Sequence, residues 1–242
     1  MVTALDIRDS IPGDVVDYRQ LTSLLGSYAK PRDRITALLA AGELIRVRKG
    51  LYVLGERYRR EALVREQLAN LIYGPSYVSL DYALSRHGLI PERVDEVTSV
   101  TTGEHRRFVT PMGVFSYRKI APRRYAQGME WRGDGVARYL MASPEKALAD
   151  KVASDRRLRR PTSADVRAYL LYDLRIDVDQ LAKLDLTRLH GIADGYRSHR
   201  VSVLARTVAR LQESLQSRSN PRPGTARRRS TRPLSVRTRF DR

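Results

Sequence analysis

The apolar residues of the N-terminal segment follow a helical period. In "DYRQLTSLL" the leucines recur every three or four residues, which predicts an amphipathic helix, and Gly26 is a stop signal after it. Pro31 suits the first turn of a second helix, because its missing N–H is not needed there. Ile35, Leu38 and Leu39 form the buried stripe of that helix. The pattern predicts two helices joined by a turn.

The period then changes to that of a short hairpin, "LIRVRKGLYVL". Ile45 and Val47 alternate with Arg46 and Arg48, so the arginines share one face of the predicted strand. Gly50 supplies the positive φ that a tight turn needs. Residues 15–55 are therefore expected to fold as helix, turn, helix and hairpin.

Beyond residue 57, strand-like and helix-like segments alternate. A helix over residues 58–76 is expected to lead out of the hairpin and to end at Gly74-Pro75. "YVSL" and "EVTSVTT" are strand-like, "DYALSRHGLI" is a helix, and "RRFVTPMGVFSYRKI" reads as two strands with a turn. Ser143 is a good N-cap for a helix that begins at Pro144, and short helices follow through residue 196. The patterns predict an α+β unit with a small, largely antiparallel sheet.

The segment "SHRVSVLARTVARLQESLQSR" predicts a long final helix. Its apolar residues, Val201, Leu204, Val208, Leu211 and Leu215, are spaced by three and four. The seam spans about two heptads, whereas a coiled coil needs about three or four. Packing against the chain's own second unit is the favoured interpretation, and a dimer seam is the alternative.

The charge of the chain indicates what kind of molecule it binds. The 242 residues carry a formal net charge of +18, which predicts a polyanionic partner, nucleic acid first and an acidic membrane surface second. Residues 217–242 contain nine Arg and one Asp with few large apolar side chains, so we expect a disordered basic tail there. No apolar run approaches the ~18 residues of a membrane span. The lack of cysteine fits a reducing cytoplasm.

The charge and the helix–hairpin order together favour DNA binding. Residues 27–53 hold six Lys or Arg against two acidic residues. A helix that presents alanines between basic flanks can enter the major groove, and a basic hairpin beside it can contact phosphates or the minor groove. This predicts a winged helix-turn-helix. Two alternatives remain open: a small helical unit with a solvated hairpin, and a winged helix that binds protein.

The sequence contains few candidates for catalytic residues. The four histidines, His87, His105, His190 and His199, do not form a metal-binding spacing, and no glycine-rich phosphate loop or nucleophile elbow is present. In "SPEKALADK", Glu145, Asp150 and Lys151 could be read as a nuclease centre, but Mg²⁺ would need a further acid, and Asp134 lies in the turn-like "RGDG". The alternative is a capped helix with exposed charges, in which Lys146 pairs with Asp150. We expect no catalytic residue, no metal and no cofactor.

Three stretches in this order resemble the AbiEi family, the antitoxin and transcriptional-regulator half of type IV abortive-infection toxin–antitoxin systems. "LLAAGELIRVRKGLYVL" resembles the winged helix of the family. "YVSLDYALSRHGLIPERVDEVTSVTTG" resembles the start of its second domain, and "FVTPMGVFSYRKIAP" followed by "ASPEKALADKV" resembles the sheet and helix after it. The likeness covers roughly residues 15–155, and more loosely extends to about 215.

The resemblance implies a cytoplasmic protein without a catalytic site. Its N-terminal domain would bind inverted repeats in its own promoter as an autorepressor, and its second domain would neutralise a nucleotidyltransferase-like toxin. The family's DNA-contacting positions map onto Lys30, Arg32, Arg34, Arg46, Arg48 and Lys49. Of these, Arg32 is expected to project nearest the buried side of its helix.

The expected fold is α+β, with three parts and a monomeric or weakly dimeric state. Residues 1–57 would form the winged helix-turn-helix, residues 58–216 the α+β antitoxin domain ending in helices, and residues 217–242 the basic tail. Two other functions stay open: a stand-alone winged-helix regulator with an effector-binding domain, and an enzyme that processes nucleic acid.

Overall fold

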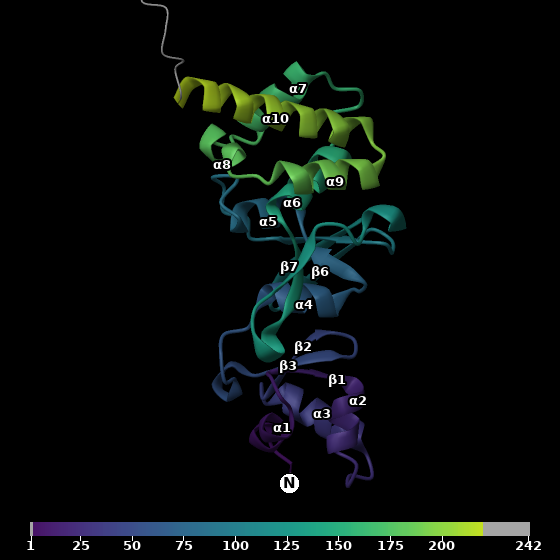
Figure 1. Cartoon of the computed structure of the whole chain (residues 1–242). Coiled ribbons are helices and arrows are strands. Elements are labelled where there is room, and N and C mark those ends of the chain that lie inside the picture. The colour runs from purple at the N-terminus through teal and green to yellow at the C-terminus, as the bar shows by residue number, and fades with distance from the viewer. Residues whose placement is uncertain (1, 220–242) are drawn as a thin grey trace, which may run out of the picture.

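The computed structural model describes residues 2–219 and has a mixed α+β architecture. A helical N-terminal unit lies at one end, a twisted sheet with its helices occupies the middle, and the C-terminal helices cover the other end (Figure 1). None of the helices within the described range is long and apolar enough to cross a membrane. The predicted tail falls outside this range, apart from residues 217–219, which continue the last helix.

The N-terminal unit has the predicted order of helix, helix and hairpin, with one helix and one strand added in front. Its elements are α1 (Ala4–Ser10), β1 (Val15–Asp17), α2 (Tyr18–Leu24), α3 (Pro31–Ala40), β2 (Leu44–Arg48) and β3 (Leu51–Leu54). β3 lies between β1 and β2 in a three-stranded antiparallel sheet. Pro31 does begin its helix, and Gly50 has a φ of 83°, as the turn requires.

The hairpin β2–β3 belongs to two hydrophobic cores. Leu44, Tyr52 and Leu54 pack into the core of the N-terminal unit. Val47, Leu51 and Val53 pack into the larger core of the second unit. A bulge between Arg46 and Arg48 shifts the register of β2 against β3. Both faces of the hairpin are therefore packed, and Arg46, Arg48 and Lys49 remain exposed beside these contacts.

The second unit contains a six-stranded sheet in the order β6-β7-β5-β4-β9-β8. The strands are β4 (Ser76–Val78), β5 (Val97–Thr101), β6 (Arg106–Thr110), β7 (Gly113–Lys119), β8 (Met129–Arg132) and β9 (Tyr139–Ala142). The pairs β5–β7 and β4–β9 are parallel, and the other three are antiparallel. The prediction of a largely antiparallel sheet holds for three of the five strand pairs, and the two parallel pairs were not predicted. Parallel pairing joins segments that are distant in sequence, so local alternation does not reveal it.

Helices flank this sheet, and the C-terminal ones form the end of the molecule opposite the N-terminal unit (Figure 1). They are α4 (Arg65–Ile72), α5 (Leu80–Arg86), α6 (Pro144–Ser154), α7 (Ser163–Ala168), α8 (Val178–Ala182), α9 (Leu186–Tyr196) and α10 (His199–Ser219). The helix expected over 58–76 is limited to α4. Arg59 Nε donates to the carbonyl of Leu54 at 2.8 Å, and the Arg60 N–H donates to Asp14 Oδ2 at 3.0 Å, so the linker follows the N-terminal unit instead of coiling.

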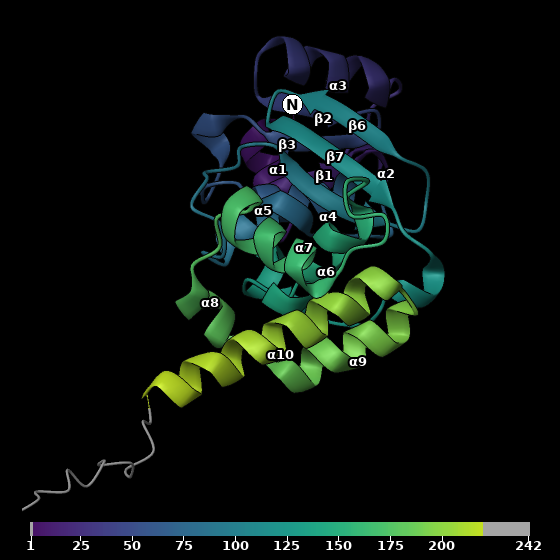
Figure 2. The ribbon, with the colours of Figure 1, turned by 90° about the horizontal axis from the view of Figure 1, so that it is seen from above.

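The final helix packs on its own chain, as the favoured interpretation of its seam predicted. Val201, Leu204 and Val208 are fully buried, and Leu211 is buried. The helix lies over α6, α7, α8 and α9 (Figure 2). Gln212 Nε2 donates to the carbonyls of Leu181 and Leu184 at 2.9 and 3.0 Å, which fixes α8 beneath α10.

Candidate nucleic-acid interface

Helix α3 presents an exposed, mixed face beside the hairpin. Ile35 and Leu38 are buried against the N-terminal core, and the helix packs on β2. On the opposite side Asp33, Thr36, Ala37 and Ala40 are exposed. Small side chains on this face leave the helix backbone accessible, which is the property needed for close approach to a groove.

The three basic residues at the start of α3 have different environments. Lys30 and Arg32 are exposed. Arg32 Nε donates to the hydroxyl of Tyr18 at 3.0 Å, which orients its guanidinium along the helix surface. The expectation that Arg32 projects nearest the buried side was wrong. That description fits Arg34, which is partly buried and donates from Nε to the carbonyl of Val2 at 2.9 Å.

The N-terminal residues explain this difference between Arg32 and Arg34. The sequence pattern did not predict α1, which begins at Ala4 with Thr3 as its N-cap and a reciprocal Thr3–Asp6 capping box. The Ala4 N–H donates to Glu43 Oε2 at 3.0 Å, so α1 is tied to the end of α3. Thr3 followed by Asp6 was the local signal that could have revealed the helix.

The three basic residues of the hairpin are all available to a ligand. Arg46, Arg48 and Lys49 are exposed. Within residues 2–219 none of the three forms an ion pair, since no carboxylate lies within salt-bridge distance of them. The structure thus places five of the six candidate residues on the surface of two adjacent elements, and it holds the sixth, Arg34, in an internal contact.

Contacts with the second unit hold the hairpin in place. The apolar face of the hairpin packs into the core of the second unit. In addition, a turn between β8 and β9 reaches the N-terminal unit, where Val136 lies against Gly13. A cavity of about 430 Å³ between the two units is lined by Val15, Leu51 and Leu63 among others. The orientation of the basic hairpin is consequently set by the second unit as well as by α3.

The charged residues of α6 form a buried cluster, which corrects the expectation of exposed charges. Lys146 and Asp150 have side chains only 0% and 1% exposed, and Lys146 Nζ lies 3.4 Å from Asp150 Oδ1. The predicted pair therefore exists, but in the protein interior. Helix α6 is enclosed because α5, α9 and α10 all pack against it.

Hydroxyl groups complete the coordination of this buried pair. Asp150 Oδ2 accepts hydrogen bonds from Tyr77 at 2.9 Å and from Ser79 at 2.7 Å. The hydroxyl of Tyr196 donates to Asp150 Oδ1 and accepts from Lys146 Nζ, which lies 2.6 Å away. A buried charge pair is tolerated when its remaining hydrogen-bonding capacity is filled in this way.

Burial shifts the protonation equilibria in this cluster. Desolvation lowers the pKa of the Lys146 ammonium, although the Asp150 carboxylate opposes the shift. Desolvation and the same carboxylate raise the pKa of the Tyr77 and Tyr196 hydroxyls well above their usual range. The tyrosines therefore remain protonated donors, and the cluster acts as a fixed structural element.

Glu145, weighed above as a metal ligand, has a separate set of partners. Its Oε2 accepts from the Ser143 hydroxyl at 2.9 Å, and its Oε1 accepts from the Asp185 N–H at 3.0 Å. These bonds connect the start of α6 to the start of α9. Among the residues that the structure describes, no group of three or more His, Asp or Glu side chains is arranged to hold a metal ion.

Neither a protein-family model nor a curated protein matches the sequence.

Proposed function

We propose that the protein binds double-stranded DNA through α3 and the β2–β3 hairpin. The observation that carries this proposal is the placement of Arg46, Arg48 and Lys49 beside an exposed helix face, where they are exposed and have no carboxylate partner among residues 2–219. The order α1, β1, α2, α3, β2, β3 supports a winged helix-turn-helix, in which α3 would be the recognition helix and the hairpin the wing.

The division of roles between the two elements follows from their side chains. The alanines and Thr36 on α3 suit contact with base edges in the major groove, whereas Lys30 and Arg32 at its start suit the flanking phosphates. The wing supplies further phosphate contacts. Arg34 is held by the Val2 carbonyl, so we assign it to the structure of the unit.

The resemblance to AbiEi antitoxins supports a more specific role. In this proposal the protein represses its own promoter at inverted repeats, and residues 58–216 counteract a nucleotidyltransferase-like toxin in the cytoplasm. A stand-alone regulator would share the DNA-binding surface but not the toxin. Co-expression with the neighbouring gene, scored as growth rescue, separates these two.

The test of DNA binding is the triple variant Arg46→Ala/Arg48→Ala/Lys49→Ala in the full-length protein. We expect much weaker binding to promoter DNA, and a log–log salt dependence that falls by about 0.9 for each phosphate contact removed. Binding would be measured by fluorescence anisotropy with a labelled promoter duplex over a salt series.

A second triple variant, Arg159→Ala/Arg160→Ala/Arg167→Ala, is the matched control. It removes the same charge from exposed positions of the second unit that make no ion pair with a described residue. If both variants lose the same affinity, net charge alone explains the binding. If the hairpin variant keeps the promoter affinity and salt slope of the wild type, the wing assignment is wrong.

A further inference from the structure

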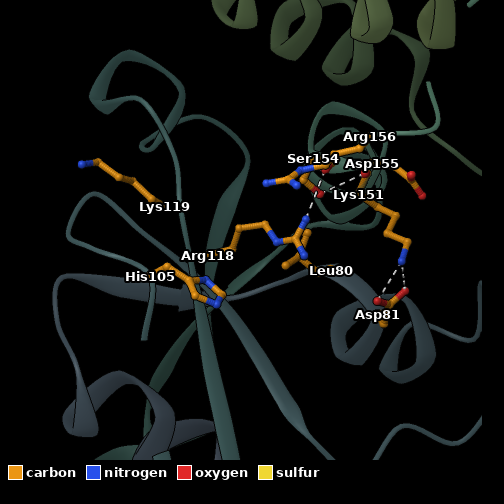
Figure 3. Close-up of a pocket in the computed structure, with 9 residues that line it drawn as sticks. All are labelled: Leu80, Asp81, His105, Arg118, Lys119, Lys151, Ser154, Asp155 and Arg156. Atoms are coloured by element: carbon orange, nitrogen blue, oxygen red, sulfur yellow. Dashed lines mark hydrogen bonds and ion pairs between the residues drawn. The ribbon is translucent and has the colours of Figure 1, made fainter. Parts of the chain in front are cut away.

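A cavity of about 760 Å³ lies at one edge of the six-stranded sheet, far along the chain from the hairpin. β5 and β7 are parallel neighbours, so both end at this edge. The start of α5 and the end of α6 border the same space, through Leu80 and Ser154 (Figure 3). Its volume falls within the about 300–1,000 Å³ of ordinary ligand pockets.

The lining of the cavity has an excess of positive charge. Its ionisable residues are Asp81, His105, Arg118, Lys119, Lys151, Asp155 and Arg156. Lys151 Nζ is neutralised by Asp81 at 2.7 Å. Asp155 is occupied by Arg157, 3.0 Å away, and by the hydroxyl of Tyr169. Both carboxylates of the lining are therefore committed to partners other than Arg118 and Arg156.

Arg118 and Arg156 are left without a carboxylate anywhere in residues 2–219. Arg118 Nη1 donates to the carbonyl of Ser154 at 3.2 Å, which holds its side chain across the cavity and leaves its other N–H groups unused. In the view of Figure 3 both guanidinium groups lie near Ser154, and the His105 ring lies beside Arg118. All three side chains are exposed to solvent at the cavity mouth.

This combination of groups fits a phosphate. Guanidinium groups present several N–H donors in a planar fork that matches phosphate oxygens, and the bonds are strengthened by charge. Among the described residues, no Phe, Tyr or Trp lines the cavity, and His105 supplies the aromatic ring of its lining. The charged lining therefore favours recognition of the phosphate group over that of a base.

We propose that this cavity binds a phosphate group between Arg118 and Arg156, carried by a free polyphosphate or by the end of a nucleic-acid strand. Helix capping accounts for only part of the arrangement, because Arg118 bonds the last turn of α6 but Arg156 has no such contact. The proposal does not depend on DNA binding by the N-terminal unit, which uses other residues.

The test titrates inorganic tripolyphosphate into the full-length protein by calorimetry at about 0.15 M salt, where surface charges are screened beyond about 8 Å. The variants are Arg118→Gln and Arg156→Gln, and Arg160→Gln is the control with the same charge change on an exposed residue outside the cavity. We expect each cavity variant to bind about ten-fold more weakly, as a lost charge-assisted bond implies, and the control to bind like the wild type.

A second arm identifies the source of the phosphate. A single-stranded hexanucleotide with a 5′-phosphate is compared with the same strand bearing a 5′-hydroxyl. A preference for the phosphorylated strand that Arg156→Gln removes assigns the site to strand ends, whereas an effect on tripolyphosphate alone assigns it to free polyphosphates.

Arg156→Gln is the decisive variant, because Arg156 is exposed and its side chain forms no hydrogen bond or ion pair with another residue in the range 2–219. The proposal is overturned if the wild type does not bind either probe, if Arg156→Gln binds both as the wild type does, or if Arg160→Gln is weakened equally. None of these outcomes affects the promoter binding that is expected of the hairpin. Either proposal can therefore be refuted without the other.

Discussion

The basic residues of the β2–β3 hairpin and the charged residues of α6 meet opposite environments in one chain. Arg46, Arg48 and Lys49 face solvent without an ion-pair partner in the described residues. Lys146 and Asp150 are enclosed, paired and hydrogen-bonded to tyrosines. The charges of the hairpin are therefore available to a ligand, whereas the charges of α6 already interact with each other inside the fold. The comparison shows that charge content does not distinguish a binding surface from a structural cluster; burial and partners do.

The largest expected effect comes from breaking the buried cluster. Asp150→Ala would leave the Lys146 ammonium in the interior without its carboxylate and remove the acceptor of three hydroxyl groups. We expect the free energy of unfolding to fall by about 3–5 kcal/mol, as for other broken buried ion pairs. Urea denaturation followed by circular dichroism measures this loss.

The hairpin triple variant is the matched control for that experiment. Removal of three exposed charges that form no ion pair within residues 2–219 should change the free energy of unfolding by less than about 0.5 kcal/mol. If the two variants lose similar stability, the contrast between solvated and structural charges is not valid for this protein.

An intermediate loss of stability is expected where the hairpin packs against the second unit. Leu51 lies on the hairpin but packs into the core of the second unit. Leu51→Ala should reduce the free energy of unfolding by about 2 kcal/mol, the lower end for a buried leucine, since the residue already borders a cavity. Thermal melts should show one transition if the hairpin couples the two units. Two separated transitions in the wild type would show that this contact does not couple them.

The smallest effect concerns acid sensitivity in the second unit. His87 is half-buried, its Nε2 lies 2.8 Å from the carbonyl of Ala142, and burial lowers its pKa below the ordinary value of 6.5. Below about pH 6.5 the unfolded chain therefore binds a proton that the folded chain does not, so stability falls as the pH drops. The fall continues until the pH reaches the folded-state pKa.

His87→Gln removes this titration and can retain an N–H donor to Ala142. The variant should lose less stability than the wild type between pH 7 and pH 5, as measured by urea denaturation at each pH. Identical pH profiles would show that burial of His87 does not contribute to acid sensitivity.

Much of the local structure was predictable because it depends on neighbours in the chain. Pro31 begins α3, Gly50 takes a positive φ in the hairpin, and Ser143 caps α6 through the Lys146 N–H at 3.2 Å. The turn around residues 111–113 and the buried seam of α10 followed from the same kind of signal. Capping, turn geometry and helical period act over a few residues, so a single sequence contains them.

Other features depend on contacts between segments that are distant in the sequence, and local patterns do not predict such contacts. β8 and β9 were not predicted, and the parallel pairs of the sheet join residues such as Val78 and Met141. The charges of α6 read as exposed, because nothing in "SPEKALADK" indicates that Tyr77 and Tyr196 will surround them. The cavity residues Arg118 and Arg156 had no local signal either, since they come from the ends of different elements.

By itself the sequence determined the order of α2, α3 and the β2–β3 hairpin, the exposure of Arg46, Arg48 and Lys49, and the strong positive charge of the chain. Only the tertiary structure decided that both faces of the same hairpin are packed, that Arg34 is held by Val2, and that two arginines without an ion pair in residues 2–219 meet at a cavity. The physical reason is one of range. Side-chain alternation is a property of the strand, whereas burial and pairing depend on what the rest of the chain packs against that strand.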